Sequence, residues 1–194
     1  MANPIDLKAL EHKAWTTYFQ DGLWDLFFGI MVLSMGLRGL TDNPVFTMGV
    51  MLALVVAIFG KRYITIPRIG VVKFGPARKA KQRRIAAALI ISLLVLVGFL
   101  LPEYWLPLAV VPLSPLIALW LAVFFAILAH ALEFPRLYLY GLLFAGSEFV
   151  WGVYGLPFGP LAHVLSGTLI IVIGIGVLLR FLHQYPQVTG YETD

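Results

Sequence analysis

The chain has 194 residues, of which 60% are hydrophobic and 12% are charged, and its mean hydropathy is +0.90. A soluble domain carries about 25% charged residues, so this composition excludes an ordinary soluble protein and indicates a helical membrane protein. The net charge of +4 does not call for nucleic acid, because the preference of lysine and arginine for the inner membrane surface explains it. With no cysteine, disulfides, thiolate metal sites and cysteine nucleophiles are excluded.

The first expected element is an amphipathic helix over residues 4–20. Asn3-Pro4 is typical of a helix start, and the apolar residues that follow recur at helical spacing with charged residues on the opposite face. We expect this helix to lie on the cytoplasmic membrane surface. The alternative is a polar extension of the first membrane span.

Six apolar segments predict transmembrane helices. They cover about residues 22–40, 45–60, 85–101, 115–133, 137–155 and 161–183. About 20 apolar residues are needed to cross the hydrocarbon core, and most of these segments approach or reach that length. The whole chain, residues 1–194, is therefore predicted to be one all-α polytopic bundle. Whether segment 102–113 also enters the bilayer stays open.

A basic loop at residues 61–84 predicts the orientation of these spans. It holds nine of the fourteen lysine and arginine residues. Cytoplasmic loops carry such an excess, so the loop and both termini are expected in the cytoplasm, with the protein in the cell membrane. In this arrangement thirteen of the fourteen basic residues lie on the inner side, and only Arg38 lies on the outer side.

The composition of the basic loop predicts two features. Residues 63–66 and 71–74 are rich in β-branched side chains and flank turn-forming residues, which indicates a small cytoplasmic β-hairpin between the second and third spans. A cluster of basic residues then opens the third span, where we expect it mainly to set the orientation of the span, with anionic-lipid binding as its functional interpretation. These residues are Arg78, Lys79, Lys81, Arg83 and Arg84.

Small residues at helical spacing mark the faces on which the helices are expected to pack. Glycine and alanine let helix backbones approach closely in lipid. The stripes run through Gly22, Asp25, Gly29, Val32, Gly36 and Gly39; Ala118, Ala122, Ala126, His130 and Glu133; Gly141, Ala145, Glu148, Gly152, Gly155 and Gly159; and His163, Gly167 and Gly174. A charge at mid-bilayer costs about 2.5–3.5 kcal/mol on insertion scales, so the ionisable members of these stripes should face other helices.

The predicted topology separates these ionisable groups by depth. Asp25 and His130 are expected near the inner surface, together with the neighbouring carboxylates Asp21 and Glu133. Glu148 and His163 fall in the outer half of adjacent antiparallel helices, which predicts that they form a pair.

Three functions are compatible with this pattern. Buried carboxylates and histidines are typical of proton relays, so the sequence favours a transport or channel-like protein for a small solute or ion, with proton coupling through Glu148, His163 and Asp25 and with His130 as a further candidate. The alternative is a non-catalytic membrane subunit or scaffold that binds protein partners, a second copy of itself or anionic lipid. Metal and cofactor sites are not expected, because no local signature for either is present.

An intramembrane hydrolase is the third alternative. Gly146-Ser147 and His163 resemble the serine and histidine helices of rhomboid proteases only in part, because Glu148 stands where that family's Gly-x-Ser-Gly motif needs glycine. The two elements also lie on one predicted hairpin, whereas that family separates them. An enzyme is therefore less favoured than a transporter or a scaffold.

Overall fold

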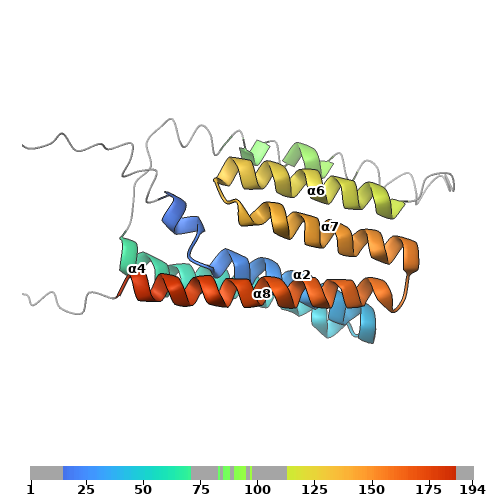
Figure 1. The fold of residues 1–194 in the computed structure, drawn as a ribbon, viewed down its shortest axis with the longest axis horizontal. Coiled ribbons are helices and arrows are strands. Elements are labelled where there is room, and N and C mark those ends of the chain that lie inside the picture. The colour runs from blue at the N-terminus through green and yellow to red at the C-terminus, as the bar shows by residue number, and fades with distance from the viewer. Residues whose placement is uncertain are drawn as a thin grey trace, which may run out of the picture.

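The fold is described here from a computed structural model, which places residues 15–70, 83, 85–87, 90–94, 97 and 113–186. All regular structure in these ranges is helical, which confirms the predicted class. Figure 1 shows the long helices α2, α6, α7 and α8 running side by side, with α7 between α6 and α8. The packing is that of a helical bundle.

Helix α2 spans Leu23–Thr41 and follows a sharp bend of the chain. Residues 15–19 are helical, but the chain turns at residues 20–22, where Gly22 takes a left-handed conformation with φ 92°. The Asp21 carboxylate accepts the Leu23 N–H at 3.1 Å and so caps the first turn. The remainder of the predicted amphipathic helix, residues 4–14, lies outside the described residues.

The second helical stretch runs without a break from Pro44 to Ile69. It consists of the 3-10 turn η1 (Pro44–Thr47), α3 (Met48–Gly60), the π-helical turn η2 (Lys61–Thr65) and α4 (Ile66–Ile69). The predicted β-hairpin is therefore wrong in its first strand, because residues 63–66 are helical; its second strand, residues 71–74, lies outside the described residues. A helix satisfies its own backbone hydrogen bonds, and this advantage near lipid outweighs the β propensity of the side chains.

The second half of the chain forms three helices close to the predicted spans. They are α6 (Leu113–Leu132), α7 (Arg136–Tyr154) and α8 (Phe158–Gln184). Tight turns join them, and Gly155 between α7 and α8 has a φ of 63°. Successive helices are thus antiparallel, as Figure 1 shows.

Four helical stretches in the described part of the chain are long and apolar enough to cross a membrane. They are Trp15–Thr41, Pro44–Ile69, Ser114–Leu132 and Phe158–Gln184. Helix α7 has a suitable length but is more polar and is not among the four, and the predicted span 85–101 lies largely outside the described residues. The structure therefore supports a membrane-embedded protein with four candidate spans, and does not reach the six that the sequence predicts.

The α2–α8 interface is built from the predicted glycine stripes. A Cβ atom on Gly29 would lie 2.8 Å from the backbone nitrogen of Ile171, and one on Gly167 would lie 2.4 Å from that of Leu33. Real Cβ atoms do not come so close to backbone, so only glycine allows this approach. The prediction that these two glycine faces pack against other helices is confirmed.

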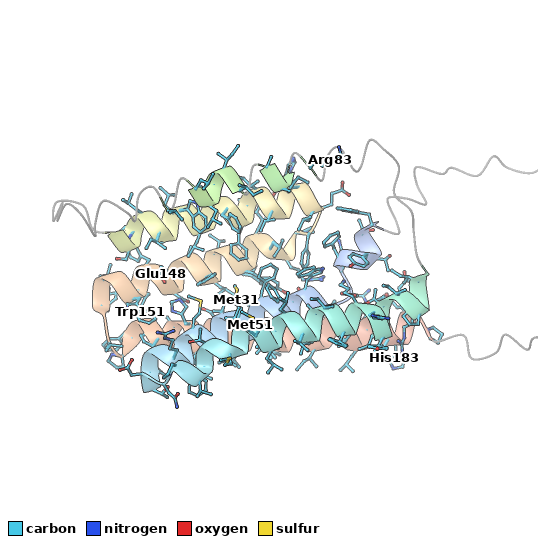
Figure 2. The ribbon with its side chains drawn as sticks, turned by 180° about the vertical axis from the view of Figure 1, so that it is seen from behind. Met31, Met51, Arg83, Glu148, Trp151 and His183 are labelled. Atoms are coloured by element: carbon cyan, nitrogen blue, oxygen red, sulfur yellow. The ribbon has the colours of Figure 1, made fainter. Side chains whose placement is uncertain are left out.

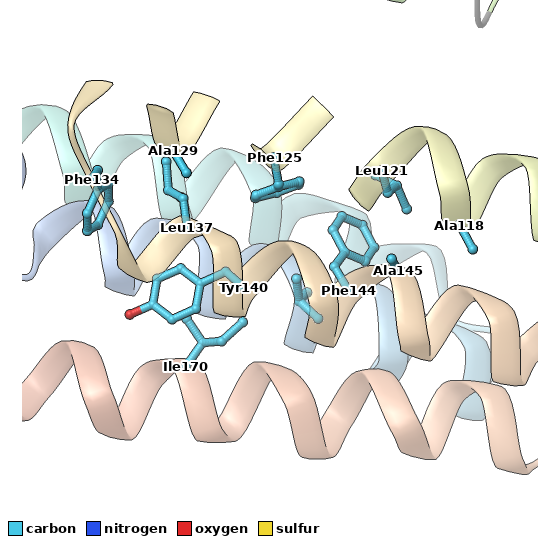
Figure 3. Packing of buried hydrophobic residues seen from close by; sticks show 11 residues of the cluster. Ala118, Leu121, Phe125, Ala129, Phe134, Leu137, Tyr140, Phe144, Ala145 and Ile170 are labelled. Carbon is cyan, nitrogen blue, oxygen red and sulfur yellow. The ribbon is translucent and has the colours of Figure 1, made fainter. Parts of the chain in front are cut away.

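An apolar core joins α6 and α7 to this pair. Figure 3 shows Phe125 of α6 facing α7, and Tyr140 directed from α7 toward Ile170 of α8. Phe125 also makes an edge contact with Phe144, with the ring centroids 6.0 Å apart. The core thus fixes α7 against α6 on one side and α8 on the other.

Candidate functional site

We call the end of the bundle at Asp21, Lys61 and Arg136 the inner end, after the side that the sequence predicts for it, and the opposite end the outer end. Figure 2 shows Glu148 and Trp151 near the outer end and His183 at the inner end. Ionisable side chains occur in separate groups toward the two ends.

Glu148 and His163 are brought together by α7 and α8. The His163 Nε2 atom lies 3.5 Å from the Glu148 Oε2 atom. The His163 side chain is completely buried, whereas the Glu148 side chain is 21% exposed. The pair therefore links a buried imidazole to a carboxylate that retains access to the surface.

The surroundings of His163 define the roles of its two ring nitrogens. Its Nδ1 atom lies 3.0 Å from the Gly159 carbonyl oxygen, which can only accept a hydrogen bond, so Nδ1 carries a proton. In the neutral ring Nε2 is then the basic nitrogen, and it has no hydrogen-bond partner among the described residues. Phe144 and Trp151 make edge contacts with the ring at 5.7 and 5.5 Å between centroids. The protonatable atom consequently faces Glu148 from an aromatic enclosure.

Two serines extend the polar contact between α7 and α8. The hydroxyls of Ser147 and Ser166 lie 2.9 Å apart, and Ser147 also donates to the Leu143 carbonyl at 2.7 Å. The hydrogen bonds of Ser147 thus go to the neighbouring helix serine and to its own helix, while His163 faces Glu148. This geometry provides no serine–histidine pair for a hydrolase.

A cavity of about 840 Å³ opens at the outer end between α2, η1, α3 and α7. Its wall includes the charged Arg38 and Asp42, and Arg38 donates a 2.8 Å hydrogen bond to the Thr47 hydroxyl. Trp151 forms part of the same wall and contacts His163. One indole therefore separates the cavity from the buried imidazole.

The first inner network joins the bend that precedes α2 to η2. Lys61 donates to Asp21 with 2.7 Å between Nζ and Oδ2, and both side chains are buried. Thr65, one turn further along, donates to the same carboxylate oxygen. Lys61 also donates to the Tyr18 carbonyl and lies 4.2 Å from the centroid of the Tyr18 ring. A carboxylate and an ammonium group that would each be costly in lipid are thus neutralised together.

The second inner network joins α2 to α7. Arg136 donates from Nε and Nη2 to the two oxygens of Asp25, each at 2.9 Å, and the Tyr140 hydroxyl donates to Asp25 as well. Asp25 is completely buried, and the Arg136 side chain is 27% exposed. Such a bidentate pair holds its two helices in a fixed register.

An apolar layer separates the inner networks from the Glu148–His163 pair. On α7, Tyr140 and Glu148 are eight residues apart, which is about 12 Å along a helix. Val32, Phe144 and Ile170 lie between these levels on the three packed helices and are all buried. The polar groups toward the two ends thus form two sites and not one continuous chain.

The other predicted site residues are placed differently. Helix α6 packs through Ala118, Leu121, Phe125 and Ala129, so Ala118 is the member of the predicted alanine stripe that lies in the buried core. His130, at the other end of that stripe, is exposed and does not join Asp25. Glu133 directly follows the end of α6 and has a φ of 56°. Its backbone carbonyl accepts a hydrogen bond from the Gln20 side-chain amide at 3.4 Å. Of the predicted lipid-binding residues, Arg83 is exposed and the other four lie outside the described residues.

Sequence reasoning missed four side-chain partners in the inner networks: Lys61, Thr65, Arg136 and Tyr140. Lys61 and Arg136 were expected only as topology determinants, and Tyr140 was not singled out. One sequence signal could have predicted the two ion pairs. Asp21 and Asp25 lie near the start of the first span, and the basic residues at the inner ends of other spans are expected at the same depth.

Comparisons with known proteins add no assignment. No protein family, curated protein or solved structure matches this chain. Among the described residues, no group of three or more histidine, aspartate or glutamate side chains is arranged to hold a metal ion. Any function must therefore be inferred from the contacts above.

Proposed function

We propose that this membrane-embedded chain is a transport or channel-like protein for a small solute or ion, with Glu148 and His163 as its proton-carrying pair. The observation that carries the proposal is the completely buried His163, whose basic nitrogen faces a partly exposed carboxylate 3.5 Å away. A group in this position can gain or lose a proton through Glu148 while the imidazole itself stays away from water.

The chemistry of the pair is simple. When it holds one shared proton, either Glu148 is protonated beside a neutral imidazole or an ionised Glu148 faces an imidazolium, and both states have zero net charge. Loss of that proton leaves an ionised Glu148 beside a neutral His163 and a net charge of −1. Because a buried charge is costly near lipid, the proton occupancy of the pair can be linked to a charged or polar solute nearby.

The outer cavity and the apolar layer beneath it support a gated pathway around this pair. The outer cavity reaches Trp151, which contacts His163, and the apolar layer at Val32, Phe144 and Ile170 closes the bundle beneath it. In this proposal the chain crosses the membrane six times with both termini in the cytoplasm, and the Asp25 network holds the closed inner end.

Proton flux in proteoliposomes tests the proposal. Purified protein is reconstituted with a pH-sensitive dye inside the vesicles, and a potassium diffusion potential drives proton entry in the absence and presence of a panel of small solutes. We expect Glu148→Gln to lower the protein-dependent flux at least about tenfold, because glutamine cannot ionise. Tyr154→Phe, which removes an exposed ionisable group on the same helix outside the cavity lining, is the matched control.

A parallel pair of histidine variants separates chemistry from packing. His163→Gln should remove the flux, and His130→Gln, on the exposed face of α6, should not. Wild-type flux equal to that of empty vesicles under all solutes, or full flux in Glu148→Gln, would contradict transport through this pair.

The alternative function is a non-catalytic membrane subunit or scaffold. The two inner networks favour it, because each pairs a buried carboxylate, Asp21 just before α2 or Asp25 within it, with a cation from another helix and so serves to fix the helices. Under this alternative Glu148→Gln lowers only the melting temperature in detergent. Protein partners, a second copy of the chain, and anionic lipid bound at residues 78–84 remain proposals that accompany it.

A further inference from the structure

A second, smaller pocket lies at the inner end, where the segment before Gly22 folds over the ends of α7 and α8. Its volume is about 330 Å³. It is lined by Thr16, Thr17, Gln20, Arg136, Val177, Arg180, Phe181, Gln184 and Tyr185. The bend at Gly22 positions the first three of these residues opposite the last three, so the pocket is a consequence of that bend.

The lining of this inner pocket is polar and basic. Only Val177 and Phe181 among the nine lining residues are apolar, in a chain that is 60% hydrophobic. None of these nine described residues is a carboxylate. Asp25 balances the charge of Arg136, whereas Arg180 has no carboxylate partner among the described residues. The described part of the pocket thus carries one positive charge that no described carboxylate neutralises.

The donors in this pocket match the oxygens of a phosphate group. A guanidinium has five N–H donors, and Asp25 accepts from two of the Arg136 nitrogens, which leaves further donors on the same group. The Thr17 hydroxyl and the Gln184 amide add neutral donors. Arginine combined with such groups is the usual protein environment for phosphate.

We propose that this inner pocket binds a phosphate-bearing anion between Arg136 and Arg180. The pocket lies where α8 ends, at the level at which a membrane helix meets lipid headgroups. The phosphate can therefore come from the headgroup of an anionic phospholipid or from a soluble phosphate compound. The site is separate from the Glu148–His163 pair and does not depend on the transport proposal.

Two measurements on the full-length protein in detergent test this site and distinguish the two sources. Native mass spectrometry compares the retention of phosphatidylglycerol with that of phosphatidylcholine, and thermal unfolding is followed with and without inorganic phosphate at constant ionic strength. The variants are Arg180→Gln and Gln184→Leu in the pocket, with Arg62→Gln as the matched control. Arg62 is an exposed arginine near the same end that does not line the pocket.

Loss of one charge-assisted contact should weaken phosphate binding by about tenfold in Arg180→Gln. Preferential retention of phosphatidylglycerol that falls in both pocket variants and persists in Arg62→Gln supports a lipid headgroup. Stabilisation by inorganic phosphate with the same dependence on the variants supports a soluble phosphate. An absence of both effects in the wild type, or equal losses in Arg180→Gln and Arg62→Gln, overturns the proposal.

Discussion

Replacing Asp25 with asparagine should destabilise the bundle strongly. Asp25 is completely buried and accepts two 2.9 Å hydrogen bonds from Arg136 and a third from the Tyr140 hydroxyl. Removing one partner of a buried ion pair costs about 3–5 kcal/mol, because the other charge is left without compensation. The Arg136 side chain is 27% exposed and can turn partly to water, so we expect the lower limit, about 3 kcal/mol.

The assay is equilibrium unfolding in mixed micelles, followed by far-ultraviolet circular dichroism. Asp42→Asn is the control: Asp42 is exposed and ends α2 in a left-handed conformation, with φ 52°, which asparagine also tolerates. Its free energy of unfolding should stay within about 0.5 kcal/mol of the wild type.

A double-mutant cycle with Arg136→Gln identifies the cause of the loss. Because the two side chains are in direct contact, the double variant should be more stable than the sum of the single effects predicts, by about 1–3 kcal/mol. Additive effects, or an Asp25→Asn variant as stable as Asp42→Asn, would refute the view that this pair holds α2 against α7.

Three further changes test other contacts, each by thermal unfolding in detergent. Gly167→Val should cost about 2–3 kcal/mol, because its side chain would meet the α2 backbone. Gly176→Val on the same helix should have little effect, because a Cβ atom at Gly176 lies in open space, with no described heavy atom beyond its own stretch of helix within 4 Å. Lys61→Met should cost about 3 kcal/mol by leaving a buried carboxylate without its cation, and Arg62→Met, at the exposed neighbouring position, should be close to neutral. Trp15→Phe should cost about 1 kcal/mol, because it removes the 3.0 Å hydrogen bond from the indole to the carbonyl at the end of α6.

The helices and their glycine faces could be predicted because they follow from local patterns. The lengths of the apolar segments predicted the bounds of α2, α6, α7 and α8 to within a few residues. Glycines at helical spacing predicted the faces through which α2 and α8 make contact. The approach of Glu148 to His163 also followed, since a short turn joins two antiparallel helices and places residues on either side of it at similar depths.

What could not be predicted depends on packing between distant segments. The face of α6 was misassigned because large residues such as Phe125 and Leu121, and not the small residues alone, form the contact with α7. The helix at residues 61–69 replaces the expected strand, and it brings Lys61 and Thr65 one turn apart within reach of Asp21. The charge of Lys61 was a signal for this pairing, whereas Thr65 becomes apparent as a partner only in the fold.

The glycine contact between α2 and α8 also bears on how the protein is made. Helix α2 leaves the ribosome well before α8, the last of the described helices, yet the two share the most extensive helix–helix contact among the described residues. The glycine face of α2 therefore stays unpaired, in the bilayer or the translocon, until α8 has been inserted. We expect biogenesis to be sensitive at this stage, so that chains interrupted before α8 become substrates for membrane chaperones or proteases.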